Sequence, residues 1–426
     1  MLTIPFIRAN SEITIQGLTK KHVANASEIV HQLIAMDDQR KSLLQQAESA
    51  LEISNAAAKE IGSLMQSGQK ELAEGKRAET AALKGTIKEK EEAAKAAEKQ
   101  MLDLLVTLPN LPHSSVPEGK TAEENEVVLT WGSLPNMQAD AQPHWDLIKK
   151  YDIIDFDLGN KITGAGFPVY KGKGARLQRA LINFFLDEAI KVGYYEIQPP
   201  ILINEDSGFG TGQLPDKEGQ MYHITADGLY LIPTAEVPVT NVYANEIIKE
   251  NEIPVKMTAY TPCFRREAGS FGSDVRGLNR VHQFDKVEII QLVHAENSYA
   301  VLEEMVAHVE KLLNLLELPY RVLRLCGGDM GFTSALTYDF EVYSAAQQKW
   351  LEVSSVSNFE TFQTNRMKIR HKDENGKTQL LHSLNGSSLA LPRIVAALLE
   401  NNQTEAGIVL PQILHKYVGA SIIEKK

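Results

Sequence analysis

Between about Ser27 and Leu105 the chain contains no proline, and this long stretch constrains the fold more than any other feature. Alanine, glutamate, lysine and glutamine dominate it, as in the segment 89–99, and these residues are strong helix formers. Glycines are sparse, and Gly68 stands near the middle, where a glycine can end one helix and turn the chain. The stretch therefore predicts two long helices that meet near Gly68.

Apolar residues recur at helical spacing in both limbs of this stretch. They are Leu33, Met36, Leu43 or Leu44, Ala47 and Leu51 in the first limb, and Leu72, Leu83, Ile87, Ala94, Ala97, Met101 and Leu104 in the second. A limb of roughly 40 residues extends roughly 60 Å at the rise of an α-helix. We therefore expect a long antiparallel helical hairpin, a coiled coil, as an N-terminal domain over residues 1–110.

The composition of the chain changes after Pro109 and Pro112, which cannot continue a helix. We expect a linker over about residues 109–130. From about Trp131 onward, β-rich runs such as 287–293 alternate with amphipathic helical segments such as 298–316, without a strict βαβ order. This mixture predicts an α+β domain with an antiparallel sheet over residues 111–426.

Bulk properties exclude several classes of protein. The net charge of −11 argues against a general nucleic-acid coat protein, so any contact with RNA needs a local basic patch. No apolar run approaches the roughly 20 residues that span a bilayer, the N-terminus does not resemble a signal peptide, and only Cys263 and Cys326 are present. We expect a cytoplasmic protein with no membrane contact and no disulfide framework. The scattered histidines, among them His294, have no HExxH or HxxxH spacing and give no zinc signal.

The stretch 258–288 reads as a strand, a Gly/Ser-rich loop and a returning strand. Residues two apart in a strand share a face, so Arg265 and Glu267 should point the same way. On the returning strand the residues that should share a face are His282, Phe284, Lys286 and Glu288. A guanidinium suits phosphate oxygens, an aromatic ring suits a purine, and a carboxylate suits an ammonium group or an exocyclic amine. This hairpin therefore predicts a nucleotide site.

The same segment resembles motif 2 of the class II aminoacyl-tRNA synthetases and is specifically similar to the seryl-tRNA synthetase family. The similarity extends over nearly the whole chain. Segment 193–200 resembles motif 1, segments 208–215 and 231–240 resemble the serine-site segments, segment 350–358 resembles the end of the site, and segment 384–393 resembles motif 3. The resemblance implies a class II catalytic domain and a homodimer. Two departures stand in motif 3, where Ser388 and Pro392 occupy positions expected to be glycine.

The resemblance also implies roles for individual residues. The catalytic set is Arg265, Glu267 and Arg393, in which Arg265 holds the α-phosphate of ATP. The implied ATP-binding residues are Arg265, Arg266, Glu267, Phe284, Glu352, Val353, Ser354, Ser355 and Arg393, with Phe284 and Arg393 on either side of adenine. Glu352 and Ser355 are the implied Mg²⁺ ligands. In a regular strand these two would face opposite sides, so the chain should bend near Ser354.

The implied serine-binding residues are Thr234, Ala235, Glu236, Glu288 and Ser387. Serine has an ammonium and a hydroxyl group, and a small site with two carboxylates suits both, although the pattern does not tell which glutamate takes which group. The helical arm is expected to bind the tRNA backbone through the basic residues Lys76, Arg77, Lys84 and Lys88. The implied substrates are L-serine, ATP and tRNA(Ser), and tRNA(Sec) is a further candidate.

Three alternatives stay open at this level. Another class II synthetase, for proline or threonine, would share motifs 2 and 3 but not the Thr-Ala-Glu segment 234–236 or the N-terminal hairpin. A non-catalytic paralogue would keep the fold but need not keep the charged set around Arg265. A ligase that loads serine onto a different carrier would not need the long arm.

Overall fold

The structure is a computed structural model that describes residues 1–135, 141–268 and 276–425. The chain divides into two compact units, Met1–Leu111 and Pro112–Lys426. The Gly/Ser-rich loop expected within the motif 2 hairpin falls largely on residues 269–275 and lies outside the described residues.

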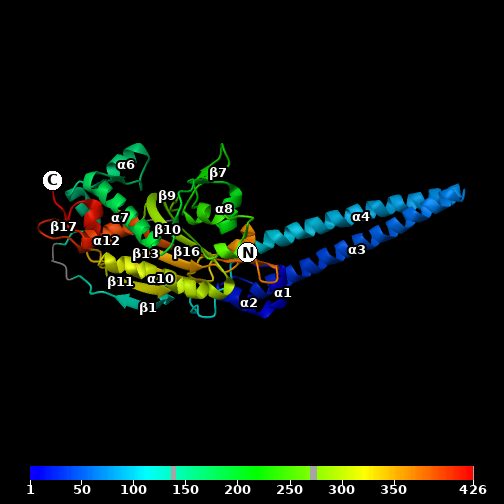
Figure 1. The fold of residues 1–426 in the computed structure, drawn as a ribbon, viewed down its shortest axis with the longest axis horizontal. Helices are drawn as coiled ribbons and strands as arrows, with labels where there is room; N and C mark the ends of the chain where they lie inside the picture. The colour runs from blue at the N-terminus through cyan, green and yellow to red at the C-terminus, as the bar shows by residue number, and fades with distance from the viewer. Residues whose placement is uncertain (136–140, 269–275, 426) are drawn as a thin grey trace. The chain divides into compact units, whose positions relative to one another are not determined.

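The first unit is built on the helices α3 (Ala26–Gln66) and α4 (Lys70–Leu105), which pack along one another as a hairpin (Figure 1). The turn between them contains Gly68, whose φ of +77° lies in the left-handed region that favours glycine. The expected coiled-coil hairpin and its turn are confirmed.

The seam between these helices uses smaller residues than the sequence predicted. Leu33, Ala47, Ala94 and Ala97 are buried as expected, but Leu51 and Leu72 are exposed. The predicted Met101 is also buried, near the base, together with Val30 and Leu105, and the buried residues of the distal part include Ala50, Ser54, Ala57, Ala73 and Thr80. Small side chains let two helices approach closely. The prediction that Leu51 and Leu72 lie in the contact between the helices was therefore wrong for the distal part of the hairpin.

Two short helices, α1 (Ile4–Ala9) and α2 (Ser11–Lys20), cover the base of the hairpin. Their apolar residues Ile7 and Leu18 join Val30, Leu33 and Leu105 in one buried cluster. Asp37 of α3 is buried there and accepts hydrogen bonds from Arg8 of α1 at 3.0 Å and from Arg40 at 2.9 Å. This base, which the helical pattern did not predict, ties the N-terminus to the hairpin.

The second unit contains an eight-stranded sheet in the order β1-β11-β12-β13-β16-β10-β9-β4. Its strands are β1 (Glu126–Trp131), β11 (Tyr320–Arg324), β12 (Leu336–Ser344), β13 (Lys349–Asn358), β16 (His382–Ala390), β10 (Gln283–Val293), β9 (Val255–Phe264) and β4 (Tyr195–Glu196). All neighbouring pairs are antiparallel except β4 and β9. The predicted α+β class is confirmed. The expected linker ends earlier than residue 130, because β1 pairs with β11 at the sheet edge.

The three longest helices of this unit pack against the sheet, and they are α7 (Gly172–Lys191), α10 (Ser298–Leu315) and α12 (Leu391–Asn401) (Figure 1). The predicted apolar stripe of α7 is fully buried, including Leu177 and Phe184. Pro392 lies in the first turn of α12, where its fixed φ suits a helix start. In the described ranges no helix is both long enough and apolar enough to cross a membrane.

Shorter elements complete this unit. The helices are α5 (His144–Lys150), α6 (Phe156–Ile162), α8 (Glu205–Thr211), α9 (Glu236–Asn241), α11 (Phe362–Met367), α13 (His415–Val418) and the 3₁₀ turns η1 (Ala122–Glu124), η2 (Glu250–Glu252), η4 (Ala295–Asn297) and η5 (Gln412–Leu414). The strands are β2 (Ile154–Asp155), β3 (Val169–Tyr170), β5 (Leu202–Ile203), β6 (His223–Ile224), β7 (Leu229–Leu231), β8 (Ile247–Ile248), β14 (Arg370–Lys372), β15 (Thr378–Leu380), β17 (Ile408–Val409) and β18 (Ile422–Ile423).

Candidate active site

The paired strands β9 and β10 position the central residues of the candidate site. Gln283 pairs with Phe264 and Glu288 with Ala259, in one antiparallel ladder. Phe284, Lys286 and Glu288 alternate along β10 and therefore share one face. Arg265 follows the end of β9, and its backbone N–H donates to the carbonyl of His282 at 2.9 Å.

One cavity of about 550 Å³ brings most of the sequence-predicted residues together. The predicted residues that line it are Thr234, Glu236, Arg265, Glu267, Phe284, Glu288, Glu352, Val353, Ser354, Ser355, Ser387 and Arg393. Ala235 does not line it, since it is buried in an apolar cluster beneath. Arg266 is exposed and also lies outside the lining. His282 stacks on Phe167 at 5.3 Å rather than facing the cavity.

Two buried carboxylates occupy one part of this cavity. The hydroxyl of Thr234 donates to Glu288 Oε2 at 3.2 Å, and Lys286 forms an ion pair with the same carboxylate. Glu288 Oε1 is buried and has no hydrogen-bond partner among the described residues. Burial raises the pKa of Glu288, and the positive charge of Lys286 opposes this rise. An unsatisfied buried carboxylate oxygen is costly, so it marks a place for a donor from a ligand.

The second carboxylate, Glu236, is held by Gln363, whose side-chain amide donates to Glu236 Oε1 at 2.6 Å. Burial, followed by the negative charge of Glu288, raises the pKa of Glu236 to about 7. Lys286 and Gln363 were not predicted as site residues. The alternation of Phe284, Lys286 and Glu288 was a usable signal for the lysine, whereas Gln363 lies on α11, more than a hundred residues away in sequence.

Arg265, Phe284 and Arg393 line the same cavity as these carboxylates. The guanidinium of Arg265 lies 5.3 Å from the ring centroid of Phe284 and donates to the carbonyl of Pro233 at 3.4 Å. Arg393 donates to the backbone carbonyls of Asn279 and Glu352 at 2.9 and 2.7 Å, so the start of α12 is fastened to two other segments. Glu267 accepts a hydrogen bond from Arg280 at 3.0 Å. Two guanidinium groups and an aromatic ring can bind the phosphate and base of a nucleotide.

A β-bulge places Glu352 and Ser355 on one face of the sheet. Ser355 pairs with Asp339 and Ser354 with Phe340, but Glu352 pairs with Glu341, so Val353 is an extra residue in β13. The spacing of Glu352 and Ser355 requires a bend, which was expected near Ser354. The bulge places this bend one residue earlier, at Val353. Asp339 adds a third oxygen donor, because its Oδ1 is buried and has no partner among the described residues. Burial, followed by the charge of Glu352, raises the pKa of Asp339 well above its ordinary value.

The two departures in motif 3 are accommodated locally. Ser388 is fully buried and its hydroxyl lies 3.4 Å from Nε2 of His308, outside the cavity lining. Pro392 lines the cavity as part of the first turn of α12. Ser387, the predicted serine contact, lines the cavity and pairs with Glu288 across β16 and β10. The hydroxyl of Ser354 donates to the carbonyl of Ser387 at 2.6 Å, which fixes the neighbouring strand.

The four basic residues predicted for the arm all lie on α4. Arg77, Lys84 and Lys88 are exposed. Lys76 instead forms ion pairs with Glu60 of α3 at 3.3 Å and with Glu79 at 3.1 Å, so its charge is already engaged across the hairpin.

Comparisons with known proteins agree with this architecture. Residues 1–112 match the family model described as the seryl-tRNA synthetase N-terminal domain, and residues 222–402 match the class II tRNA synthetase core domain for G, H, P, S and T. A serine–tRNA ligase of Salinibacter ruber is 48% identical, with 98% of both chains covered. A serine–tRNA ligase of Trichlorobacter lovleyi is 45% identical and covers 100% of this chain and 99% of its own.

Solved structures give the same result. The crystal structure of seryl-tRNA synthetase from Pyrococcus horikoshii complexed with ATP matches with a TM-score of 0.95 and 32% identity, covering 100% of both chains. The cytoplasmic serine-tRNA ligase of Naegleria fowleri in complex with AMP matches with a TM-score of 0.89 and 25% identity, over 100% of this chain and 99% of the other. With its fold, its cavity and its full-length relatives in agreement, the chain belongs to the seryl-tRNA synthetase family.

Proposed function

We propose that this protein is a serine–tRNA ligase that activates L-serine with ATP and transfers the seryl group to tRNA(Ser). The observation that carries this proposal is the single cavity in which the buried carboxylates Glu236 and Glu288 lie with the guanidinium of Arg265. The carboxylates suit the ammonium and hydroxyl groups of serine, and the guanidinium suits a phosphate. The full-length relatives named as serine–tRNA ligases support the same activity.

The reaction has two steps. The serine carboxylate attacks the α-phosphorus of ATP, the bond to the bridging oxygen of pyrophosphate breaks, and seryl-adenylate forms. A hydroxyl of the 3′-terminal ribose of tRNA then attacks the seryl carbonyl and releases AMP. Arg265 stabilises the negative charge that grows on the α-phosphate, while Phe284 and Arg393 hold adenine.

We assign the serine ammonium to Glu288 and the serine hydroxyl to Glu236. Glu288 has a buried oxygen without a partner, and the charge of Lys286 favours its ionised form. Glu236, with a pKa of about 7, can bind a hydroxyl in either protonation state. A pocket built to pair a hydroxyl rejects alanine by roughly 10⁴-fold or more, since its polar groups would be left unpaired.

The oxygen donors of Glu352 and Ser355, with the buried Oδ1 of Asp339 beside them, fit Mg²⁺, which prefers hard oxygen ligands. When bound, Mg²⁺ would neutralise phosphate charge of ATP. The chain's own contribution is to hold these donors on one face through the bulge at Val353.

We further propose that residues 1–110 form the tRNA-binding arm and residues 111–426 the catalytic domain of a homodimer. Arg77, Lys84 and Lys88 are exposed on α4 and can reach phosphates, although Lys88 also forms an ion pair with Glu92 at 3.9 Å, and Lys76 is paired with Glu60 of α3. The dimer proposal rests on the two-residue edge strand β4, where Tyr195 is exposed, and on the exposed Val192, which lies between α7 and this strand. The cytoplasm is the proposed site of action, and tRNA(Sec) is a further candidate substrate.

The decisive experiment is ATP–pyrophosphate exchange measured with each of the twenty amino acids. We expect exchange with serine only. Exchange with proline or threonine would reassign the substrate, and no exchange with any amino acid would favour a non-catalytic paralogue. Charging of tRNA(Ser) and tRNA(Sec) transcripts then separates the two RNA substrates, and failure of both after normal exchange would favour a different carrier.

A further inference from the structure

Three potential metal ligands from distant parts of the sequence meet at a position that the active site does not use. They are Glu250 in η2, His294 directly after β10 and His371 in β14. His294 Nε2 lies 2.9 Å from Glu250 Oε1, and His371 Nδ1 lies 3.7 Å from Glu250 Oε2. One donor atom from each residue falls within 4.8 Å of the others. The two imidazole rings meet edge to face with their centroids 4.6 Å apart.

The state of His371 indicates that the cluster lacks a component. Its Nδ1 is buried and has no hydrogen-bond partner among the described residues, although the nearest oxygen of Glu250 is 3.7 Å away. A buried imidazole nitrogen without a partner is unfavourable unless a proton donor or a cation reaches it. The carboxylate of Glu250 is largely exposed, so it is free to rotate toward both rings. Around a tetrahedral ion with bonds of about 2.0–2.2 Å the ligand atoms are roughly 3.3 Å apart, and the two histidine–carboxylate distances of 2.9 and 3.7 Å lie on either side of this value.

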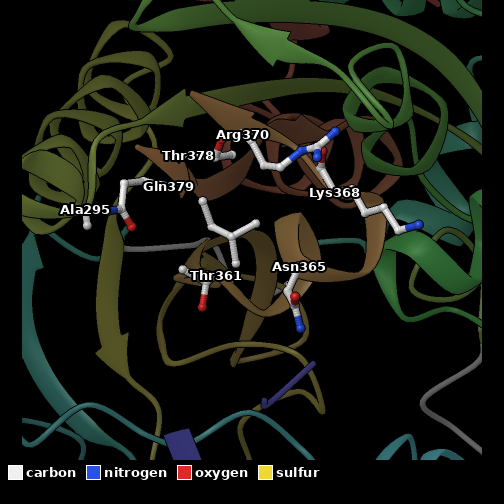
Figure 2. A pocket seen from close by; sticks show the side chains of 8 residues that line it. Ala295, Thr361, Asn365, Lys368, Arg370, Thr378 and Gln379 are labelled. Carbon is white, nitrogen blue, oxygen red and sulfur yellow. The ribbon is translucent and has the colours of Figure 1, made fainter. Parts of the chain in front are cut away.

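The cluster is separate from the nucleotide and serine cavity. His294 follows Glu288 by six residues along β10, or roughly 20 Å at the rise of a strand. None of the three residues lines the active-site cavity. A second cavity of about 520 Å³ is lined by Ala295 and Arg370, the chain neighbours of the two histidines, but by none of the three cluster residues (Figure 2). An ion would reach the cluster from the side of the exposed Glu250 carboxylate.

The basic residues at this second cavity do not occupy the cluster. Arg370 donates to the backbone carbonyls of Lys368 at 2.9 Å and Asn245 at 3.1 Å. In Figure 2 the side chain of Lys368 lies on the opposite side of the cavity from Ala295.

We propose that Glu250, His294 and His371 bind a divalent transition-metal ion of the Zn²⁺ class, with water as the fourth ligand. Two imidazoles and one carboxylate favour Zn²⁺ over Mg²⁺, which prefers an all-oxygen shell. The parallel pair of β8 and β14, in which His371 lies beside Ile248, already brings η2 close to β14, and the ion would add the end of β10 to this pair and so has a structural role.

The test titrates the metal-free, untagged full-length chain with ZnCl₂ by calorimetry, in saturating Mg²⁺ so that oxygen sites are filled. The wild-type chain should bind one equivalent. Since even outer-shell changes cost about 10–100-fold in metal affinity, Glu250→Gln and His294→Asn should each weaken this binding by at least about tenfold. Both residues are at least partly exposed, so these variants should fold. His31→Ala, which removes an exposed histidine of α3, is the matched control and should bind Zn²⁺ like the wild type.

A second readout uses Co²⁺ in place of Zn²⁺, because tetrahedral Co²⁺ absorbs in the visible range. The absorption band should be present in the wild type and His31→Ala and absent from His294→Asn. Zn²⁺ binding that is unchanged in both cluster variants, or the absence of any Zn²⁺ binding by the wild type, would overturn the proposal. Serine-dependent exchange, measured on the same samples, reports separately on the proposed ligase activity.

Discussion

Arg265 and Arg266 have the same side chain but different surroundings. Arg265 is partly buried and lines the cavity, while Arg266 is exposed beyond the end of β9. The resemblance to motif 2 could not tell which of the two arginines faces the cavity. Beyond the end of a strand, the direction of each side chain depends on the local backbone conformation, which the motif does not specify. The structure makes Arg265 the residue to test.

Arg265→Ala should lower the rate of serine-dependent ATP–pyrophosphate exchange by about 10²–10³-fold, the usual cost of removing one group that stabilises transition-state charge. Arg176→Ala, an exposed arginine of α7 outside the cavity, serves as the control. Normal exchange by Arg265→Ala would remove this residue from the mechanism.

The two carboxylates of the serine pocket should respond differently to the same change. Glu288→Gln removes the ionic partner of the ammonium and should raise the KM for serine by about 10–100-fold, the value of a hydrogen bond to a charged group. Glu236→Gln should raise it less, because an amide still pairs with a hydroxyl. Steady-state exchange kinetics of both variants, with their thermal midpoints, check the assignment, and the reverse order would exchange the two roles.

Glu236 should also make the stability of the unliganded protein depend on pH. Its pKa is about 7 in the folded chain, above its ordinary value of 4.5, so the folded state holds this proton more tightly than the unfolded state. This contribution to stability is fully present below about pH 4.5 and is lost as the pH rises through about 7. It amounts to at most about 3 kcal/mol. Thermal unfolding of wild type and Glu236→Gln from pH 5 to 8 should show a smaller loss on the alkaline side in Glu236→Gln, where the raised pKa values of Glu288 and Asp339 still contribute.

At the scale of single elements, the N-terminal base depends on one buried acid. Burial alone would raise the pKa of Asp37, but Lys41, Arg40 and Arg8 outweigh it and lower the pKa to about 2. Asp37→Asn should therefore destabilise the packing of α1 on α3 by about 1–3 kcal/mol, the range for hydrogen bonds to charged groups. Hydrogen exchange of the full chain should show lost protection in residues 4–9 and 26–45.

The neighbouring acid provides a matched control for this change. Asp38 also accepts a hydrogen bond from Arg8, at 2.6 Å, but its side chain is 60% exposed. Exposed ion pairs contribute at most about 1 kcal/mol, so Asp38→Asn should leave protection nearly unchanged. Equal effects of the two variants would contradict the special role of Asp37.

The sequence predicts elements well where a local pattern determines them. The hairpin of α3 and α4 follows from composition, and the alternation of Phe284 and Glu288 follows from the period of a strand. The support of Glu236 by Gln363 and the meeting of Glu250, His294 and His371 depend on contacts between distant segments, and the bulge at Val353 depends on the register of β13 against β12. No local pattern encodes such contacts, so they required the structure.

At the scale of the whole molecule, the two units should divide the two reaction steps. Replacing residues 44–92 with a short glycine-containing turn removes the distal hairpin but keeps the apolar base around Leu33, Met101 and Leu105. Exchange should stay near the wild-type rate, because the cavity lies wholly in the second unit. Charging of tRNA(Ser) should fall steeply, and wild-type charging should weaken with added salt as phosphate contacts are screened. Normal charging by the shortened chain would give the arm another role.

The setting of β10 between β9 and β16 has a consequence for how amino-acid preference can change. Hydrogen-bonded ladders on both sides fix the backbone under Glu288, so this acid cannot shift to accommodate a larger substrate. Thr234 lies instead between β7 and α9, and Glu236 is the first residue of α9; no ladder of the main sheet holds either residue. Libraries randomised at residues 232–236 should therefore yield altered selectivity more often than libraries built on the central strand.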